Sequence, residues 1–321
     1  MRRWIVLALG LALTTAAVAR NPQFQGADPH AMFIDGELWV FPTGGPGGSW
    51  AADRFGAFSS RDLRRWRSRG VVLRRDQIKW IGDDGATEHF LWAPGVATRD
   101  GKWYIYYSVG PQNPTPSRIG VAVSDRPQGP YRDIGHPLVT GGNGYEAIDP
   151  MVFVDPKSQI AYLYAGGSAG AKLRVWELSR DMITIAREIP INQPPEFTEG
   201  AFVHERAGVY YLSYSHGHWN GPDYSVHYAT AASPVGPWTY RGAILTSDAR
   251  HQGPGHHSFA RTPAGDWLIV YHRWDQAAGP APFRGERQIA IDRVRYAADG
   301  SIRPIVMTDG DNAPTLPLVK P

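Results

Sequence analysis

The chain has 321 residues, no cysteine, and 33 basic against 30 acidic residues, which gives a net charge of +3. The absence of cysteine excludes disulfides and a lipoprotein anchor, and a chain of this length forms one large all-β domain or two ordinary ones. A near-neutral chain also lacks the clustered basic face that a nucleic-acid partner requires.

The first residues have the form of a secretory signal. Arg2 and Arg3 precede a mostly apolar run over 4–18, and Ala17-Val18-Ala19 matches the A-x-A cleavage pattern. The run is too short to favour a permanent membrane span. The sequence therefore predicts a cleavable signal peptide over 1–19 and a secreted or periplasmic protein that has no membrane attachment after cleavage.

After the signal, short apolar-aromatic runs alternate with Gly and Pro, as expected for strands and turns. Five of these runs resemble one another, and their starts are separated by 65, 59, 48 and 57 residues. They are E-L-W-V-F from Glu37, K-W-Y-I-Y-Y-S from Lys102, A-Y-L-Y-A from Ala161, V-Y-Y-L-S-Y-S from Val209 and D-W-L-I-V-Y-H from Asp266. A four-stranded unit repeated at this period is typical of propeller blades. The sequence predicts one all-β domain over 20–321, a five-bladed β-propeller, with a β-sandwich as the alternative.

The repeats also predict which residues occupy equivalent places. A turn precedes each aromatic strand, and counting back six to eight residues from each turn gives one residue per unit. These are Asp28, Trp92, Asp149, Glu199 and His256. The innermost strands of a propeller begin around one end of its central axis. We therefore expect these five residues to share one pocket.

Three of the five residues are carboxylates, which are costly to crowd around a narrow axis outside a functional or cation-binding site. A single Asp-Pro pair, as at Asp28 and Asp149, is explained by turn formation alone, but three acids in one register are not. Paired carboxylates across a glycosidic bond carry out glycoside hydrolysis, one as a protonated donor and the other ionised. A third acid beside the donor would raise the donor's pKa.

The motifs A-D-P-H, W-A-P, A-I-D-P-M-V-F, T-E-G-A-F and G-P-G-H-H-S resemble those of glycoside hydrolase family 43, in the same order and over essentially the whole chain after the signal. The resemblance implies a five-bladed propeller that cleaves arabinofuranosidic, xylosidic or related linkages with inversion. It implies that Asp28 is the general base, Glu199 the general acid and Asp149 the residue that tunes and orients this acid. The chain departs from the family after Glu199, where Gly200-Ala201-Phe202 replaces the common Gly-Pro and a His, so the linkage stays open.

Other residues complete the predicted site. Trp92 is expected to line the substrate pocket, and Arg287 in G-E-R-Q-I-A matches an arginine near the family's active site. Phe33 is a substrate-binding candidate, and Trp219 a weaker one, from aromatic-rich loops. His256 matches the family's axial histidine, which in many members lies beside a calcium ion or a water molecule in the central channel. If calcium is bound there, water would supply most of its ligands, because calcium prefers oxygen to imidazole. No organic cofactor is expected.

The segment G-G-S-A-G at 166–170 fits the G-x-S-x-G pattern of serine hydrolases, but an alternating strand follows instead of a helix. We interpret it as a hairpin.

Taken together, the repeats, the three acids and the family resemblance predict a secreted, inverting, exo-acting α-L-arabinofuranosidase or β-xylosidase that acts on plant or microbial polysaccharides. The alternatives are an arabinan endo-1,5-α-L-arabinosidase, a galactofuranosidase and, from a different class, a non-catalytic carbohydrate-binding propeller.

Overall fold

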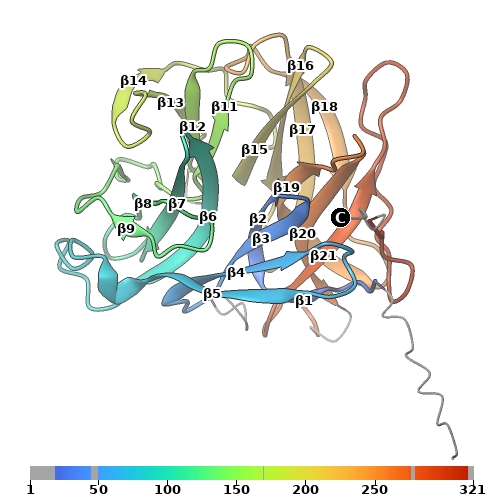
Figure 1. Ribbon diagram of the computed structural model, residues 1–321, viewed down its shortest axis with the longest axis horizontal. Coiled ribbons are helices and arrows are strands. Elements are labelled where there is room, and N and C mark those ends of the chain that lie inside the picture. Colours follow the sequence, from blue (N-terminus) through green and yellow to red (C-terminus); the bar gives the residue numbers. More distant parts are fainter. Residues whose placement is uncertain (1–18, 45–49, 169, 276–278, 317–321) are drawn as a thin grey trace, which may run out of the picture.

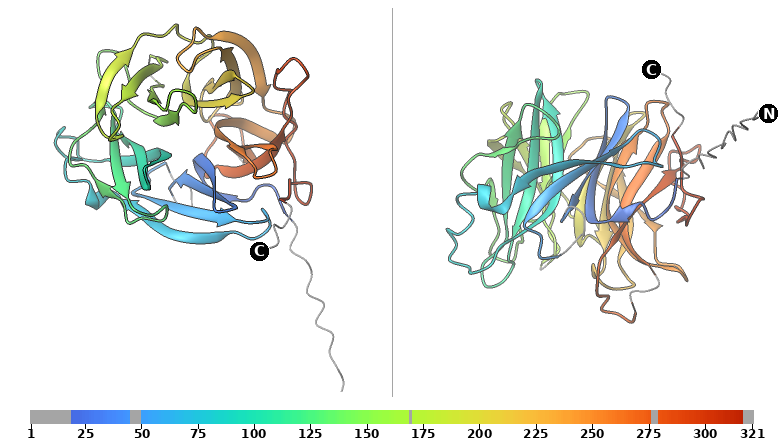
Figure 2. Two further views of the ribbon diagram at one scale, coloured as in Figure 1. Left: turned by 45° about the horizontal axis from the view of Figure 1, so that its top comes forward. Right: turned by 60° about the horizontal axis from the view of Figure 1, so that its bottom comes forward.

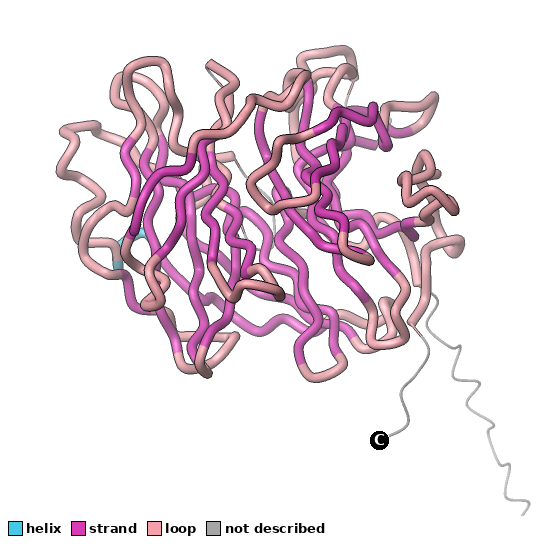
Figure 3. The backbone as a smooth tube through the Cα atoms, turned by 90° about the horizontal axis from the view of Figure 1, so that it is seen from above, coloured by secondary structure: helices cyan, strands magenta, loops and turns pink. Residues whose placement is uncertain are grey.

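The computed structural model describes residues 19–44, 50–168, 170–275 and 279–316, and residues 1–18 of the predicted signal lie outside this range. Strands dominate the described part of the chain, where the only helical element is the 3-10 turn η1 (Arg75–Gln77), as Figure 3 shows. No helix in these ranges is long and apolar enough to cross a membrane.

The strands form five antiparallel sheets that follow one another along the chain (Figure 1). The first comprises β2 (Ala27–Ile34), β3 (Glu37–Thr43), β4 (Arg54–Ser60) and β5 (Arg67–Arg74). The second comprises β6 (Phe90–Arg99), β7 (Lys102–Gly110), β8 (Arg118–Ser124), β9 (Arg132–Asp133) and β10 (Val139–Thr140). The third comprises β11 (Met151–Val154), β12 (Ala161–Ala165), β13 (Arg174–Leu178) and β14 (Ile185–Ile189). The fourth comprises β15 (Glu199–Arg206), β16 (Val209–His216), β17 (Ser225–Ala231) and β18 (Thr239–Leu245).

The fifth sheet closes the ring with a strand from the other end of the chain. Its order is β1-β21-β20-β19, in which β19 (His251–Arg261), β20 (Trp267–Asp275) and β21 (Gln288–Val294) pair with β1 (Phe24–Gln25). Figure 2 shows the five sheets arranged around a central axis. The predicted five-bladed propeller is confirmed, and the five aromatic runs are the second strands of the blades, β3, β7, β12, β16 and β20.

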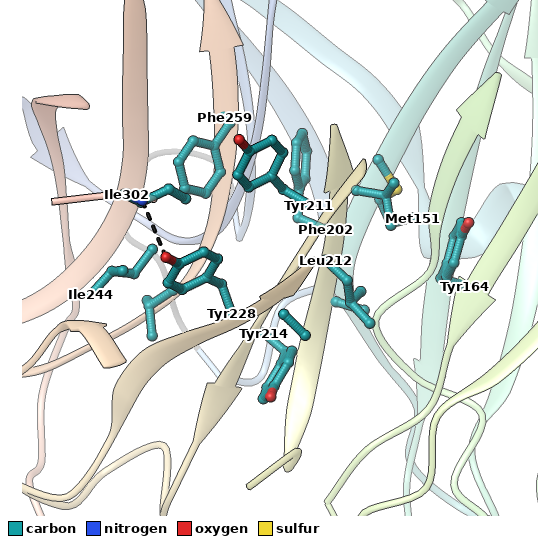
Figure 4. Close-up of a cluster of buried hydrophobic side chains, with 14 of the residues drawn as sticks. Met151, Tyr164, Phe202, Tyr211, Leu212, Tyr214, Tyr228, Ile244, Phe259 and Ile302 are labelled. Atoms are coloured by element: carbon teal, nitrogen blue, oxygen red, sulfur yellow. Dashed lines mark hydrogen bonds between the residues drawn. The ribbon is translucent and has the colours of Figure 1, made fainter. Parts of the chain in front are cut away.

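Aromatic side chains of these second strands form much of the packing between blades. Figure 4 shows one cluster, in which Tyr164 of β12, Tyr211 and Tyr214 of β16, and Phe259 of β19 are buried together. Buried tyrosine hydroxyls need partners, and here they bond backbone carbonyls: Tyr214 donates to Pro195 at 2.6 Å. The cluster therefore fixes neighbouring blades by both apolar burial and hydrogen bonds.

In each blade, a residue within the innermost strand or just before it has a left-handed backbone conformation near the axis. These residues are Asp28 (φ 47°), Ala93 (φ 46°), Asp149 (φ 56°), Gly200 (φ 63°) and His256 (φ 30°). The strand pairing shifts at this point in β2, β6, β15 and β19. The predicted register is therefore correct for three residues. It is displaced by one for Trp92 and Glu199, which precede the equivalent positions.

Most of these left-handed residues are anchored to the preceding blade. The backbone N–H of Ala93 donates to Thr43 Oγ1 at 2.7 Å, that of Asp149 to Ser108 Oγ at 2.8 Å, and that of His256 to Ser215 Oγ at 2.8 Å. In the third blade, Gly166 occupies the corresponding place and offers no side chain. The Gly200 N–H donates instead to the Asp149 carboxylate.

Candidate active site

A pocket of about 270 Å³ opens at the end of the axis where the innermost strands begin. Asp28, Trp92, Asp149, Glu199 and His256 line it together, so the predicted convergence of five residues, one from each blade, is observed. Loop residues of all five blades form its wall: Trp50, Gln112, Ser168, Trp219 and Arg287. Carboxylates from distant parts of the sequence thus face one shared pocket.

Asp28 is held as a carboxylate. Burial alone would raise its pKa, but the Arg287 guanidinium, whose Nη1 donates to Asp28 Oδ1 at 2.9 Å, holds the pKa well below its usual range. The Asp28 backbone N–H donates to Nδ1 of His272 at 3.1 Å. Burial lowers the pKa of His272 to about 4, so this imidazole is neutral at pH 7 and Arg287 is the cation that keeps Asp28 ionised.

Asp149 has the opposite electrostatic environment. Burial, the neighbouring Glu199 carboxylate and the Asp28 carboxylate all raise its pKa well above the usual value. Its Oδ2 is buried, has no hydrogen-bond donor among the described residues, and lies 3.4 Å from His256 Nδ1. Asp149 therefore keeps its proton to a higher pH than an exposed aspartate does.

Glu199 accepts a hydrogen bond at each carboxylate oxygen. Tyr224 donates its hydroxyl to Oε1 at 2.8 Å, and Ser168 donates to Oε2 at 2.9 Å. Ser168 belongs to the G-G-S-A-G segment, which is the predicted β12–β13 hairpin and passes directly over the acid. A Cβ on Gly167 would lie 2.4 Å from Glu199 Cβ, so the close approach requires glycine there.

A second cavity of about 600 Å³ adjoins the first. The two share Gln112, Ser168, Glu199 and Trp219, and the second extends toward other residues of the β16–β17 loop. Glu199 therefore lies at the boundary between the cavities, whereas Asp28 and Asp149 line only the inner one.

His256 lies between the two aspartates. Its Nδ1 is 3.5 Å from Asp28 Oδ1 and 3.4 Å from Asp149 Oδ2, and burial lowers its pKa. Within the described ranges, no group of three or more His, Asp or Glu side chains is arranged to hold a metal ion. A calcium ion bound beside His256 would take most of its oxygen ligands from water. Calcium stays a prediction.

Aromatic side chains form one side of the pocket. Trp92 lies in the pocket wall, donates Nε1–H to the Trp50 carbonyl at 2.8 Å, and covers Gly110, where a Cβ would lie 2.0 Å from its ring. Trp219 lies under the Arg287 guanidinium, 5.1 Å from it. Phe33 does not reach this pocket: it pairs with Leu38 at the far end of β2 and lines a separate cavity.

The sequence did not point to Ser168, Tyr224 and His272 as site residues. Ser168 was visible only as part of a hydrolase-like pattern that an alternating strand contradicted. Tyr224 precedes β17 in a polar loop, and His272 lies in the apolar run of β20. Their contacts with the acids arise only when adjacent blades pack.

A comparison with protein-family models matches residues 20–302 to the glycosyl hydrolases family 43. The chain belongs to this family. Its members are inverting glycoside hydrolases with carboxylate catalytic residues, so the protein is a glycoside hydrolase. The family assignment inferred from the motif series is confirmed.

Family 43 relatives match nearly the whole chain. A β-D-galactofuranosidase of Aspergillus niger is 35% identical, and the match covers 93% of this chain and 88% of the relative. A xylosidase/arabinosidase of Bacteroides ovatus is 29% identical, with 86% and 93% covered. The crystal structure of a family 43 enzyme from Xanthomonas citri complexed with xylose has a TM-score of 0.71 at 28% identity and covers 90% of this chain and 94% of its own.

Proposed function

We propose that the protein is an exo-acting α-L-arabinofuranosidase or β-xylosidase that removes terminal sugars from plant or microbial polysaccharides. Loops of all five blades wall the inner pocket, and a larger cavity adjoins it at Glu199. A pocket walled by every blade suits one terminal sugar, with the rest of the substrate in the adjoining cavity. An endo-acting enzyme would need a groove open on both sides.

The proposed roles follow from where each carboxylate lies. Glu199 is the general acid because it alone of the three acids lines both cavities, where the glycosidic oxygen between the terminal sugar and the leaving group would lie. This observation carries the proposal. Asp28, kept ionised by Arg287, is the general base that removes a proton from the attacking water in the inner pocket. The water oxygen bonds to the anomeric carbon as the glycosidic bond breaks, which gives inversion.

Asp149 is the proposed tuning residue. Its carboxyl, whose pKa is raised, lies beside Glu199, and it does not line the adjoining cavity where the leaving group would lie. Ser168 and Tyr224 orient the Glu199 carboxyl and can also accept or release its hydrogen bonds during transfer, since hydroxyls both donate and accept.

The test is a panel of 4-nitrophenyl glycosides (α-L-arabinofuranoside, β-D-xyloside and β-D-galactofuranoside) with the product anomer followed by NMR. We expect hydrolysis of one of the first two with inversion, and about 100- to 10,000-fold loss in Asp28→Asn and Glu199→Gln. A dinitrophenyl leaving group departs without a proton, so it should restore turnover in Glu199→Gln but not in Asp28→Asn. Equal loss on both leaving groups would contradict the acid assignment, and silence on the panel and on polysaccharides would favour a sugar-binding propeller.

A galactofuranosidase is the second candidate. The observation that favours it is the 35% identity with the Aspergillus niger β-D-galactofuranosidase over 93% of the chain. The α-L-arabinofuranoside and β-D-galactofuranoside rings share their stereochemistry and differ in the exocyclic group. The panel contains both, so it separates arabinofuranosidase from galactofuranosidase activity directly.

We also propose that the enzyme is secreted or periplasmic. The basic start, the apolar run and the A-x-A pattern over 1–19 support a cleavable signal. N-terminal sequencing of the exported protein should begin at Arg20, and an intact Met1 on the exported protein would contradict cleavage.

A further inference from the structure

A second cavity with a different chemical character lies on the outer part of the fifth blade. It measures about 420 Å³, and three arginines line it: Arg293 of β21, Arg295 just after that strand, and Arg303. β21 begins beside Arg287 of the catalytic pocket and runs away from it, so eight extended residues place Arg295 roughly 25 Å from that pocket. The cavity is thus separate from the active site.

The three arginines are placed side by side by strand pairing. The Arg303 N–H donates to the Arg295 carbonyl at 2.9 Å, and Tyr296 and Ile302 form the next bridge, so the two arginines lie opposite each other. Arg293 precedes Arg295 by two residues and therefore shares its face of the extended chain. Like charges directly opposite each other on paired strands are destabilising.

This arrangement is held rigidly. Ile302, next to Arg303, is buried, and its N–H donates to the Tyr228 hydroxyl at 3.1 Å (Figure 4). The neighbours Val294 and Ile302 face the core, which turns the arginines outward. The positive charges therefore cannot separate by a shift of the backbone without loss of core packing.

The local acids do not neutralise the cluster. Among the described residues, no carboxylate lies within ion-pair distance of Arg295 or Arg303, and Arg293 has only a 3.7 Å contact with Asp266. Asp292 also lines the cavity, but its carboxylate accepts hydrogen bonds from Tyr271 at 2.8 Å and from the Thr308 hydroxyl at 2.6 Å. Two guanidinium groups are left with their donors directed to solvent.

We propose that this cavity binds the carboxylate groups of an acidic glycan, as a second carbohydrate site outside the catalytic pocket. Guanidinium forks match carboxylates with two parallel hydrogen bonds. Val306, 79% exposed, and Pro304 provide an apolar rim that suits the C–H face of a sugar ring. The choice of a glycan rests on the proposed function, because a polysaccharide hydrolase meets uronic-acid sugars beside its cleavable linkages.

The test measures binding of oligogalacturonate to the full chain by calorimetry, without turnover. We expect binding to wild type that weakens at least about tenfold in Arg295→Ala/Arg303→Ala, since each lost charge-assisted bond is substantial. Arg295→Lys/Arg303→Lys should lose only part of the affinity, because lysine keeps the charge but lacks the two parallel donors of a guanidinium group. Arg64→Ala/Arg132→Ala removes equal charge from exposed positions elsewhere and should leave binding unchanged.

Three outcomes would overturn the proposal: no binding to wild type, equal weakening in the control variant, or equal affinity for a DNA oligonucleotide or inorganic phosphate at the same ionic strength. Hydrolysis of the 4-nitrophenyl substrate should be unchanged in all these variants. The binding and hydrolysis measurements are independent. Oligogalacturonate binding by an inactive protein would contradict only the proposed activity, whereas hydrolysis without oligogalacturonate binding would contradict only the second site.

Discussion

Replacing Arg287 by alanine tests how the proposed base is kept ionised. The guanidinium is 2.9 Å from Asp28 Oδ1, both side chains are buried, and the two imidazoles near Asp28 have lowered pKa values and are neutral at pH 7. Arg287 is therefore the only cation near Asp28 in the described part of the pocket. An opposite charge at this distance shifts a carboxyl pKa by about 1–3 units, which corresponds to roughly 1.4–4 kcal/mol.

The assay is the pH dependence of kcat/KM, which reports the free enzyme's essential base on its acidic side. In wild type, the lowered pKa of Asp28 places this limb at low pH. In Arg287→Ala we expect the limb to move up by about one to three pH units, because burial then raises the pKa without opposition. Arg287→Lys keeps the charge and should leave the limb low even where kcat/KM falls. An equal loss of kcat/KM at every pH in Arg287→Ala would refute this reasoning and leave Arg287 as a substrate contact only.

A stability measurement gives an independent reading of the same pair. Removing one partner of a buried ion pair costs about 3–5 kcal/mol because the other charge stays buried. A depressed carboxyl pKa stabilises the fold above the unfolded pKa, and this stabilisation is lost as the pH falls through the folded value. Arg287→Ala should thus be strongly destabilised in urea at pH 7. At pH 4 the deficit relative to wild type should narrow only by the part that comes from the unpaired charge on Asp28 in the variant, because wild-type Asp28, with its lowered pKa, is still ionised there.

Three further predictions concern other sites. Ser168→Ala should lower kcat about tenfold with little change in KM or melting temperature, because one hydrogen bond to Glu199 is lost. Gly167→Ala should lower kcat/KM about 100-fold by displacing Glu199, whereas Gly82→Ala, where a Cβ meets nothing within 4 Å, should be silent in the same assay. Burial raises the pKa of Asp292 to about 6, so stability should fall by about 2 kcal/mol from pH 4 to pH 7 through this group. Asp292→Asn should remove this part of the pH dependence of the free energy of unfolding, measured by urea titrations at each pH. An unchanged pH dependence would contradict the prediction.

The propeller could be predicted from sequence because its signal is repeated. Five aromatic second strands recur at one period, each after a turn, and strand alternation fixes which residues face the neighbouring blade. The same repeat predicted that Asp28, Asp149 and His256 meet. In these three blades the residue with the left-handed conformation is also the one with an ionisable side chain, so the side chain identified the left-handed position in the sequence.

The one-residue displacement at Trp92 and Glu199 could not be predicted in this way. The left-handed residues of these two blades are Ala93 and Gly200, whose side chains have no chemistry to mark them. A strand bulge adds a residue without a periodic signal, and a count from the next turn cannot locate it.

The partners of the acids were missed for another reason. Tyr224 reaches Glu199 from the loop before β17, and His272 reaches the Asp28 backbone from the last blade, 244 residues away in sequence. Such contacts depend on the angle between adjacent blades, which no local pattern encodes.

The displacement in the fourth blade separates the proposed acid from the proposed base. Asp28 and Asp149 lie at the left-handed positions and both face His256 on the axis. Gly200 occupies that position in the fourth blade, where a Cβ would lie 3.3 Å from the His256 ring. Glu199, one residue earlier, therefore projects away from the axis toward Ser168 and the adjoining cavity. An inverting hydrolase needs its two carboxyl groups on opposite sides of the scissile bond, with room for a water molecule. A strictly regular repeat would have put all three acids on the axis, so the shift of one residue in one blade is what distinguishes a donor from a base.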